Sequence, residues 1–197
     1  MDSIARLDRI VRDWLDDPDT TIVCGRWTDG SVGELLPRGR ARLSVAKHEG
    51  RFAGLRDLWI EGEEHHLHVD LGSFDRVAYT VVPSVCFGWR PSLELRFERA
   101  SQPTGLAFAT SSPYAVDRLR TPLAERYLRR LLHHRDEHPG LVEFVAQPAP
   151  QRTRANEATY RELAGLLWQL GARADAPPFD EHDPAGSLTR VYQEIRA

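Results

Sequence analysis

The stretch that decides the fold runs from Glu64 to Phe108 and reads EHHLHVDLGSFDRVAYTVVPSVCFGWRPSLELRFERASQPTGLAF. Apolar and polar residues alternate in three segments of it, 65–71, 76–82 and 92–98. A period of two, with β-branched and aromatic residues between Gly, Pro and Ser, is typical of half-buried antiparallel strands. We therefore expect a sheet here, with the preceding chain contributing strands to it and the following chain packing on it.

The residues before this stretch predict one helix and then further short strands. Apolar residues recur at helical spacing over residues 3–15, which predicts an amphipathic helix. Turn residues such as Asp29-Gly30 and Pro37-Arg38-Gly39 then separate alternating segments. The strands expected in this part span residues 20–27, 31–35, 40–47 and 52–60.

The residues after this stretch change to helical spacing. We expect helices over 122–134, over a segment capped by Asn156 and ended by Gly171, and over a last segment capped by Ser187. LVEFVA (141–146) is ambiguous, and residues 147–154 read as a linker. This order favours an α+β fold with about seven strands. We expect the chain to divide into an α+β domain at residues 1–146 and a linker with a helical extension at residues 147–197.

Composition and charge narrow the class of protein. The chain has 197 residues and a formal net charge of −3, so no overall positive field favours binding to nucleic acid or to an anionic membrane. Two cysteines, Cys24 and Cys86, are too few for a disulfide framework. The first residues lack the apolar core of a signal peptide, and no run is long enough to span a bilayer. We expect a cytoplasmic protein without membrane insertion.

Three polar residues at alternate positions, His66, His68 and Asp70, form the first candidate site. They share one face of a predicted strand and lie within about 7 Å along it, so they are suited to a divalent metal or to proton transfer. The alternative is a solvated polar face opposite Leu67 and Val69. Nothing else in the sequence has the spacing of a metal site.

A loop and a basic segment are the other candidates. The loop PSVCFGWRP (83–91) carries Cys86, Phe87, Trp89 and Arg90, and aromatic residues beside a cation commonly mark a binding surface. The alternative is that Phe87 and Trp89 fold back to cap the core. Six arginines between 118 and 135 could contact phosphates or carboxylates, or simply form a solvated helix face.

Three segments resemble a known family: TTIVCGRWTDGSVGELLPRG (20–39), HLHVDLGSFDRVAYTVV (66–82) and SLELRFERASQPTGLAFATS (92–111). Their pattern of strand residues resembles that of the single-repeat heme-utilization proteins of the ChuX and HutX type, and that of the C-terminal repeat of the HemS-type proteins. His68 stands in the family's Leu-His position, Ser92 to Phe97 in its hairpin strand, and Leu106 to Phe108 in its last strand. The resemblance covers about residues 20–135.

The resemblance implies a HemS/ChuX-like antiparallel sheet with an N-terminal helix and C-terminal helices. It implies a protein that binds heme for intracellular trafficking or utilization, that in some relatives degrades heme, and that pairs as a homodimer. An apolar slot with cations at its rim suits a flat macrocycle with two propionates, and histidine supplies an axial bond to iron. The expected axial ligands are His66 and His68, the expected propionate partners Arg90 and Arg96, and the expected walls Trp89, Phe87, Trp59 and Tyr79.

The sequence also departs from that family. The segment before Thr20 lacks the family's histidine-containing helix, and residues 147–197 exceed a single-repeat member. Two other hypotheses therefore stay open. One is a heme- or metal-dependent enzyme that acts on a small metabolite, so the sequence leaves enzymatic activity undecided. The other is a cofactor-free dimeric interaction module, and the ligand could also be another flat apolar molecule.

Overall fold

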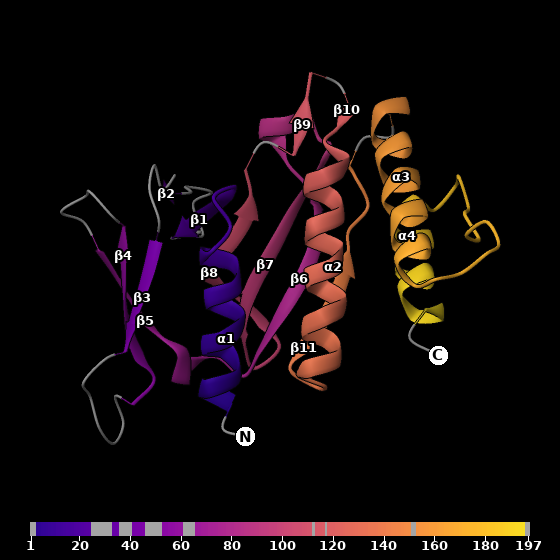
Figure 1. Ribbon diagram of the computed structural model, residues 1–197. Helices are drawn as coiled ribbons and strands as arrows, with labels where there is room; N and C mark the ends of the chain where they lie inside the picture. Colours follow the sequence, from indigo (N-terminus) through magenta and orange to yellow (C-terminus); the bar gives the residue numbers. More distant parts are fainter. Residues whose placement is uncertain are drawn as a thin grey trace. The chain divides into compact units, whose positions relative to one another are not determined.

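The computed structural model describes residues 3–24, 33–35, 41–45, 53–60, 66–111, 113–116, 118–150 and 153–195 (Figure 1). The helices are α1 (Ser3–Leu15), α2 (Thr121–Glu137), α3 (Arg154–Leu170) and α4 (Pro184–Glu194), with two 3-10 turns, η2 (Leu71–Ser73) and η3 (Val85–Phe87). The strands are β1 (Thr20–Cys24), β2 (Gly33–Leu35), β3 (Ala41–Val45), β4 (Leu55–Ile60), β5 (His66–Asp70), β6 (Arg76–Pro83), β7 (Pro91–Arg99), β8 (Gln102–Thr110), β9 (Tyr114–Ala115), β10 (Arg118–Leu119) and β11 (Val142–Ala146). The α+β class is confirmed. None of the described helices is long and apolar enough to cross a bilayer.

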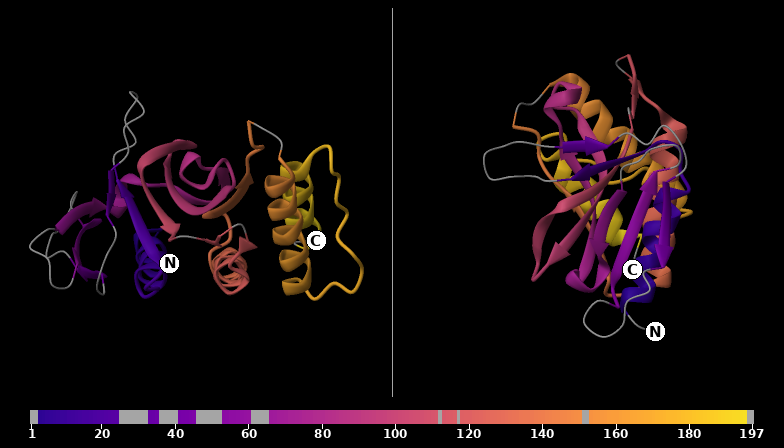
Figure 2. Two further views of the ribbon diagram at one scale, coloured as in Figure 1. Left: turned by 90° about the horizontal axis from the view of Figure 1, so that it is seen from above. Right: turned by 90° about the vertical axis from the view of Figure 1, so that its left-hand side faces the viewer.

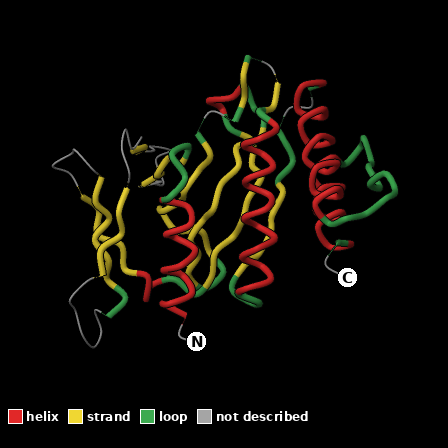
Figure 3. Tube along the Cα trace, viewed as in Figure 1, coloured by secondary structure: helices red, strands yellow, loops and turns green. Residues whose placement is uncertain are grey.

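The described strands form three sheets (Figure 3). The largest has the order β11-β6-β7-β8-β1-β2, a second has the order β3-β4-β5, and β9 and β10 form a two-stranded ribbon. A single sheet of about seven strands is therefore not confirmed. Alternation in a sequence identifies strands, but it does not say which strands pair, because pairing depends on the path of the chain between them.

The chain divides into two compact units. Unit 1 holds residues 1–78, 95–111 and 138–142, and unit 2 holds residues 79–94, 112–137 and 143–197. The predicted boundary between residues 146 and 147 stays a prediction.

The core of unit 1 is built on the apolar stripe of α1. Leu7, Ile10, Val11 and Trp14 are at most 1% exposed, as the helical spacing predicted. The Trp14 ring centroid lies 6.3 Å from that of Phe108 on β8. The sequence period alone therefore selects the face of α1 that is buried.

The sheet β3-β4-β5 has one apolar and one polar face. Antiparallel pairing places Leu43 opposite Leu58, and Leu58 opposite Leu67. Leu43 and Leu58 are buried, and α1 contacts β3 and η2. Because directly paired residues share a face, the apolar face of this sheet is the one that turns toward α1. The polar face carries Asp57 and His68.

Strands β6 and β7 are buried on both faces, which differs from the half-buried strands that their alternation predicted. Even Glu94 and Glu98 are less than 9% exposed. The carboxylate of Glu98 accepts a hydrogen bond from Arg76 Nε at 2.7 Å. Polar residues can lie on a buried face when hydrogen-bond partners satisfy them. The alternation therefore predicted which residues share a face, but it did not predict that the polar face is also buried.

The ambiguous segment LVEFVA is a strand, β11. Val77 N donates to Leu141 O at 3.0 Å, and Gln147 N donates to Val81 O at 2.9 Å. Residue numbers increase in the same direction along both strands between these two bonds, so β11 runs parallel to β6. A short apolar run is compatible with either a helix or a strand, and the pairing with β6 makes this segment a strand.

The two C-terminal helices begin earlier than predicted. Thr153, rather than Asn156, caps α3 by accepting a hydrogen bond from Asn156 N at 3.2 Å. Asp183, rather than Ser187, caps α4 by accepting one from Gly186 N at 3.0 Å. The connector between these helices runs back along α3, so that both helices point the same way (Figure 2). On this return path Glu181 forms an exposed ion pair with Arg161 of α3, at 2.6 Å.

Candidate functional site

A cleft of about 330 Å³ lies beside β5 in unit 1. Its lining is mostly apolar with three polar side chains, and consists of Leu67, His68, Val69, Asp70, Ser73, Phe74, Gly105 and Leu106. Four of these residues are consecutive in β5. Because neighbouring strand residues point to opposite faces, a cleft that touches four in a row runs along the edge of the strand. Its volume is at the lower end for a small-molecule site.

An imidazole–carboxylate pair stands at this cleft. The register of β4 and β5 places Asp57 opposite His68. His68 Nδ1 lies 2.6 Å from Asp57 Oδ1, and the His68 side chain is 60% exposed while that of Asp57 is 30% exposed. A carboxylate on one ring nitrogen fixes the orientation and the tautomer of an imidazole and directs the other nitrogen toward a ligand or a proton.

Asp70, the third member of the predicted polar face, has a structural role. Its Oδ1 accepts a hydrogen bond from Gly72 N at 3.0 Å, and its Oδ2 accepts one from Ser73 Oγ at 2.9 Å. These bonds cap η2. Among the described residues, neither His68 nor Asp70 belongs to a group of three metal-type ligands lying within 4.8 Å of one another.

The end of the cleft depends on a close approach of two glycines. Leu71 N donates to Gly54 O at 2.9 Å, which brings Gly54 against η2. A Cβ on Gly54 would lie 2.4 Å from Gly72 N and 2.7 Å from Asp70 Oδ1. Glycine is therefore required at position 54 for the turn that carries Asp70 and Ser73 into the cleft wall.

Three other predicted site residues, Trp59, His66 and Arg96, belong to unit 1. Trp59, also on β4, is 42% exposed, and its register partner is His66. The His66 side chain lies outside what the structure describes. Arg96 is half-buried on β7. Among the predicted site residues whose side chains the structure describes, His68 is the one that lines the cleft.

The loop between β6 and β7 belongs to unit 2, and its arginine is already engaged. Arg90 Nε donates to Phe87 O at 2.9 Å, and the Arg90 guanidinium lies 4.3 Å from the centroid of the Tyr114 ring. The Phe87 and Tyr114 rings are 5.5 Å apart. Trp89 is half-buried and has a positive φ of 66°. These contacts join the loop to the β9–β10 ribbon.

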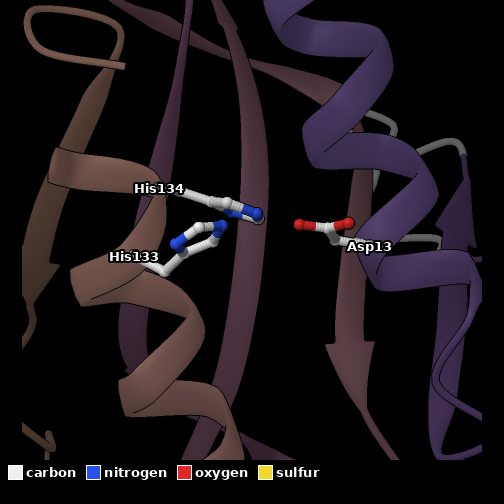
Figure 4. Close-up of side chains that lie close together, drawn as sticks. All are labelled: Asp13, His133 and His134. Atoms are coloured by element: carbon white, nitrogen blue, oxygen red, sulfur yellow. The ribbon is translucent and has the colours of Figure 1, made fainter. Parts of the chain in front are cut away.

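Tyr79 lies in the interior of unit 2. It is fully buried, and its hydroxyl is 2.7 Å from Nδ1 of His134, which is 1% exposed. His134 follows the exposed His133 on α2, and their ring centroids are 5.6 Å apart (Figure 4). The Tyr127 hydroxyl donates to Thr80 O at 2.9 Å beside them. Tyr79 is therefore part of a polar network inside the core.

This network supports a prediction about stability. We expect Tyr79→Phe to lower the free energy of unfolding by about 1 to 3 kcal/mol, because it removes a hydrogen bond from a buried imidazole. Urea denaturation measures it. A double-mutant cycle with His134→Leu separates this bond from general packing, and additive losses in the cycle would contradict the interaction.

Sequence reasoning missed Asp57 and Phe74. Asp57 lies eleven positions before His68, and only the register of β4 and β5 brings them together. Phe74 follows η2 and places its ring 5.0 Å from that of Phe97. The available signal for Asp57 was a carboxylate in the preceding predicted strand, but its partner could not be assigned without the register.

Comparison with family models and with curated proteins found no match for this chain.

Proposed function

We propose that the cleft beside β5 binds heme and that His68 Nε2 is the axial ligand of its iron. The observation that carries this proposal is the contact of His68 Nδ1 with Asp57 Oδ1 at 2.6 Å, at the rim of a largely apolar cleft. Histidines that bind metals commonly donate their other ring N–H to a carboxylate, which orients the ring and raises its basicity.

The walls of the cleft also offer apolar surface to part of a porphyrin ring. Leu67, Val69, Phe74 and Leu106 offer aliphatic and aromatic surface, and Gly105 has no side chain to obstruct a flat ring. Heme would supply an iron centre whose behaviour depends on its axial ligand and on the polarity around it. In this proposal Asp57 holds the imidazole while the apolar residues exclude water from one face of the ring.

The wider role proposed is intracellular heme trafficking or utilization, possible heme degradation included, by a cytoplasmic homodimer. It rests on the sequence resemblance. Arg96, on β7 in unit 1, remains a predicted propionate partner. Sedimentation equilibrium with and without hemin tests the dimer.

Titration with hemin tests the binding proposal. We expect a shifted Soret band with the wild-type chain, and an affinity at least about tenfold weaker with His68→Ala. His182→Ala is the matched control, because His182 is an exposed histidine in the connector before α4. A wild-type spectrum equal to that of free hemin at equimolar ratio would refute the proposal, and so would an equal loss in both variants.

A second candidate is acid–base chemistry on a small metabolite without heme. The Asp57–His68 pair favours it as well, because a carboxylate that orients an imidazole also prepares it for proton transfer. Asp57→Asn distinguishes the two. If the cleft binds heme, the Asp57→Asn variant still binds hemin but its Soret band is shifted from the wild-type position. If His68 is instead a general base, the protein does not bind hemin, and the turnover rate of the metabolite falls in the Asp57→Asn variant.

A further inference from the structure

Strand β5 lies at the edge of its sheet. In the order β3-β4-β5 of the described strands, its neighbour is β4. The cleft of about 330 Å³ runs along residues 67–70 of β5, and none of the described residues of β4 lines it. The cleft therefore lies on the side of β5 that is turned away from β4. Space of this kind beside a strand edge is where a further strand can pair.

One hydrogen bond fixes which backbone groups of β5 face the cleft. Leu71 N donates to Gly54 O, and these two residues continue the register in which Leu55 lies opposite Asp70. Hydrogen-bonded and non-hydrogen-bonded pairs alternate along two antiparallel strands. Counting back from the bonded pair 54–71, positions 69 and 67 bond to β4, and positions 70 and 68 belong to the other kind of pair. The backbone N–H and C=O groups of His68 and Asp70 therefore point away from β4, toward the cleft.

The side chains of β5 define the pattern that a pairing strand needs. Leu67 and Val69 lie on the apolar face of the sheet, and His68 lies on the polar face. Phe74 and Leu106 add apolar surface to the cleft. Because directly paired residues share a face, an added strand would place apolar residues opposite Leu67 and Val69 and a polar residue opposite His68.

We infer that the cleft accepts an extended segment of another polypeptide, which pairs antiparallel with β5 as the fourth strand of its sheet. The segment has apolar residues at alternate positions and polar residues between them. Main-chain hydrogen bonds to His68 and Asp70 supply affinity, and the alternate side chains supply specificity. Antiparallel pairing continues the pattern of this sheet and is the slightly more stable kind. This inference does not rest on heme binding.

A second copy of the chain does not fit this edge. In any copy, β4 is paired with β5 along all five residues of β5, so the two strands would have to enter the cleft together. Gly105 and Leu106 of β8 line the cleft as well, and its volume is at the lower end even for a small-molecule site. The cleft therefore admits a single extended segment rather than the edge of a folded sheet.

A hexapeptide of alternating lysine and valine, acetylated and amidated at its ends, tests the pairing. Its affinity for the full-length chain is measured by fluorescence anisotropy without hemin, because a porphyrin and a strand would exclude each other from the cleft. In antiparallel pairing, the peptide residues that bond His68 and Asp70 share their polar face, so they are the lysines. Methylating the backbone nitrogens of the lysines should weaken binding at least about tenfold. Methylating those of the valines, which point away from β5, should change it by less than about twofold.

The two methylated peptides are matched in charge and in composition, so their difference reports backbone pairing. In the chain, His68→Pro removes a backbone N–H that faces the cleft and should weaken peptide binding at least about tenfold. His68→Ala keeps this N–H and should bind the peptide like the wild type.

Urea denaturation shows whether each variant is folded, and the methylated peptides decide the question with the wild-type chain if His68→Pro does not fold. Absence of binding by the unmethylated peptide overturns the inference, as do equal affinities of the two methylated peptides or the reverse order. An equal loss of peptide binding in His68→Ala and His68→Pro would also overturn it, because it would assign the binding to the imidazole rather than to the backbone.

Discussion

Gly54→Ala is expected to lower the free energy of unfolding by about 3 kcal/mol or more. The new methyl group would lie 2.4 Å from Gly72 N and 2.9 Å from Gly72 Cα. These are backbone atoms, so a rotamer change does not relieve the overlap, and β4 must separate from η2. The hydrogen bond from Leu71 N to Gly54 O would be strained or lost with it. Urea denaturation monitored by tryptophan fluorescence measures the loss.

Gly165→Ala is the control for this prediction. A Cβ at Gly165, in the middle of α3, meets no atom within 4 Å. We expect Gly165→Ala to raise the free energy of unfolding by about 0.5 to 1 kcal/mol, because alanine is a better helix former than glycine. Similar stability changes in the two variants would contradict the close approach at Gly54. The proposal for the cleft predicts in addition that Gly54→Ala weakens hemin binding, because η2 carries part of the cleft wall.

Asp8→Asn is expected to cost about 3 kcal/mol of stability at about pH 7. Asp8 Oδ1 accepts a hydrogen bond from Arg56 Nε at 2.7 Å, and the Arg56 side chain is only 10% exposed. Removing the carboxylate charge takes the Asp8 counter-ion from this buried guanidinium, although Arg56 Nη1 still donates to Ala53 O at 2.8 Å and to Leu55 O at 3.0 Å. These remaining hydrogen bonds place the expected loss of stability at the lower end for a buried ion pair.

Arg12→Gln is the matched comparison. Arg12 binds the other oxygen of Asp8 at 2.6 Å, but its side chain is 41% exposed. Pairs of this exposure contribute about 1 kcal/mol or less. A loss with Arg12→Gln as large as with Asp8→Asn would contradict the assignment of the main effect to Arg56.

Acid should remove the effect of Asp8. Burial by itself raises the pKa of Asp8, but hydrogen bonds from Arg56 and Arg12 outweigh it and hold the pKa below its ordinary value of 3.8. A carboxyl group with a lowered folded-state pKa stabilises the fold above its unfolded-state value, and this contribution is lost as the pH falls through the folded-state value. The stability difference between wild type and Asp8→Asn should therefore narrow below the ordinary pKa. An unchanged difference at about pH 3 would show that Asp8 carries no such linkage.

The amino-acid sequence by itself determined the local elements whose signal repeats within one segment. The spacing of Leu7, Ile10, Val11 and Trp14 predicted α1 and its buried face. Alternation predicted β5 and placed Val69 on the opposite face from His68, as the structure shows. Such patterns reflect burial of one side of one element, so they need no knowledge of its neighbours.

Tertiary structure alone decided which elements meet. Strands β3, β4 and β5 form a sheet of their own, apart from the strands that follow them in the chain. Strand β11 pairs with β6, and β6 and β7 are buried on both faces. The Asp57–His68 pair and the Gly54–Gly72 approach arise only from the register of β4 with β5 and from the turn after it. Pairing and register depend on contacts between residues distant in the chain, and no periodicity within a single segment encodes them.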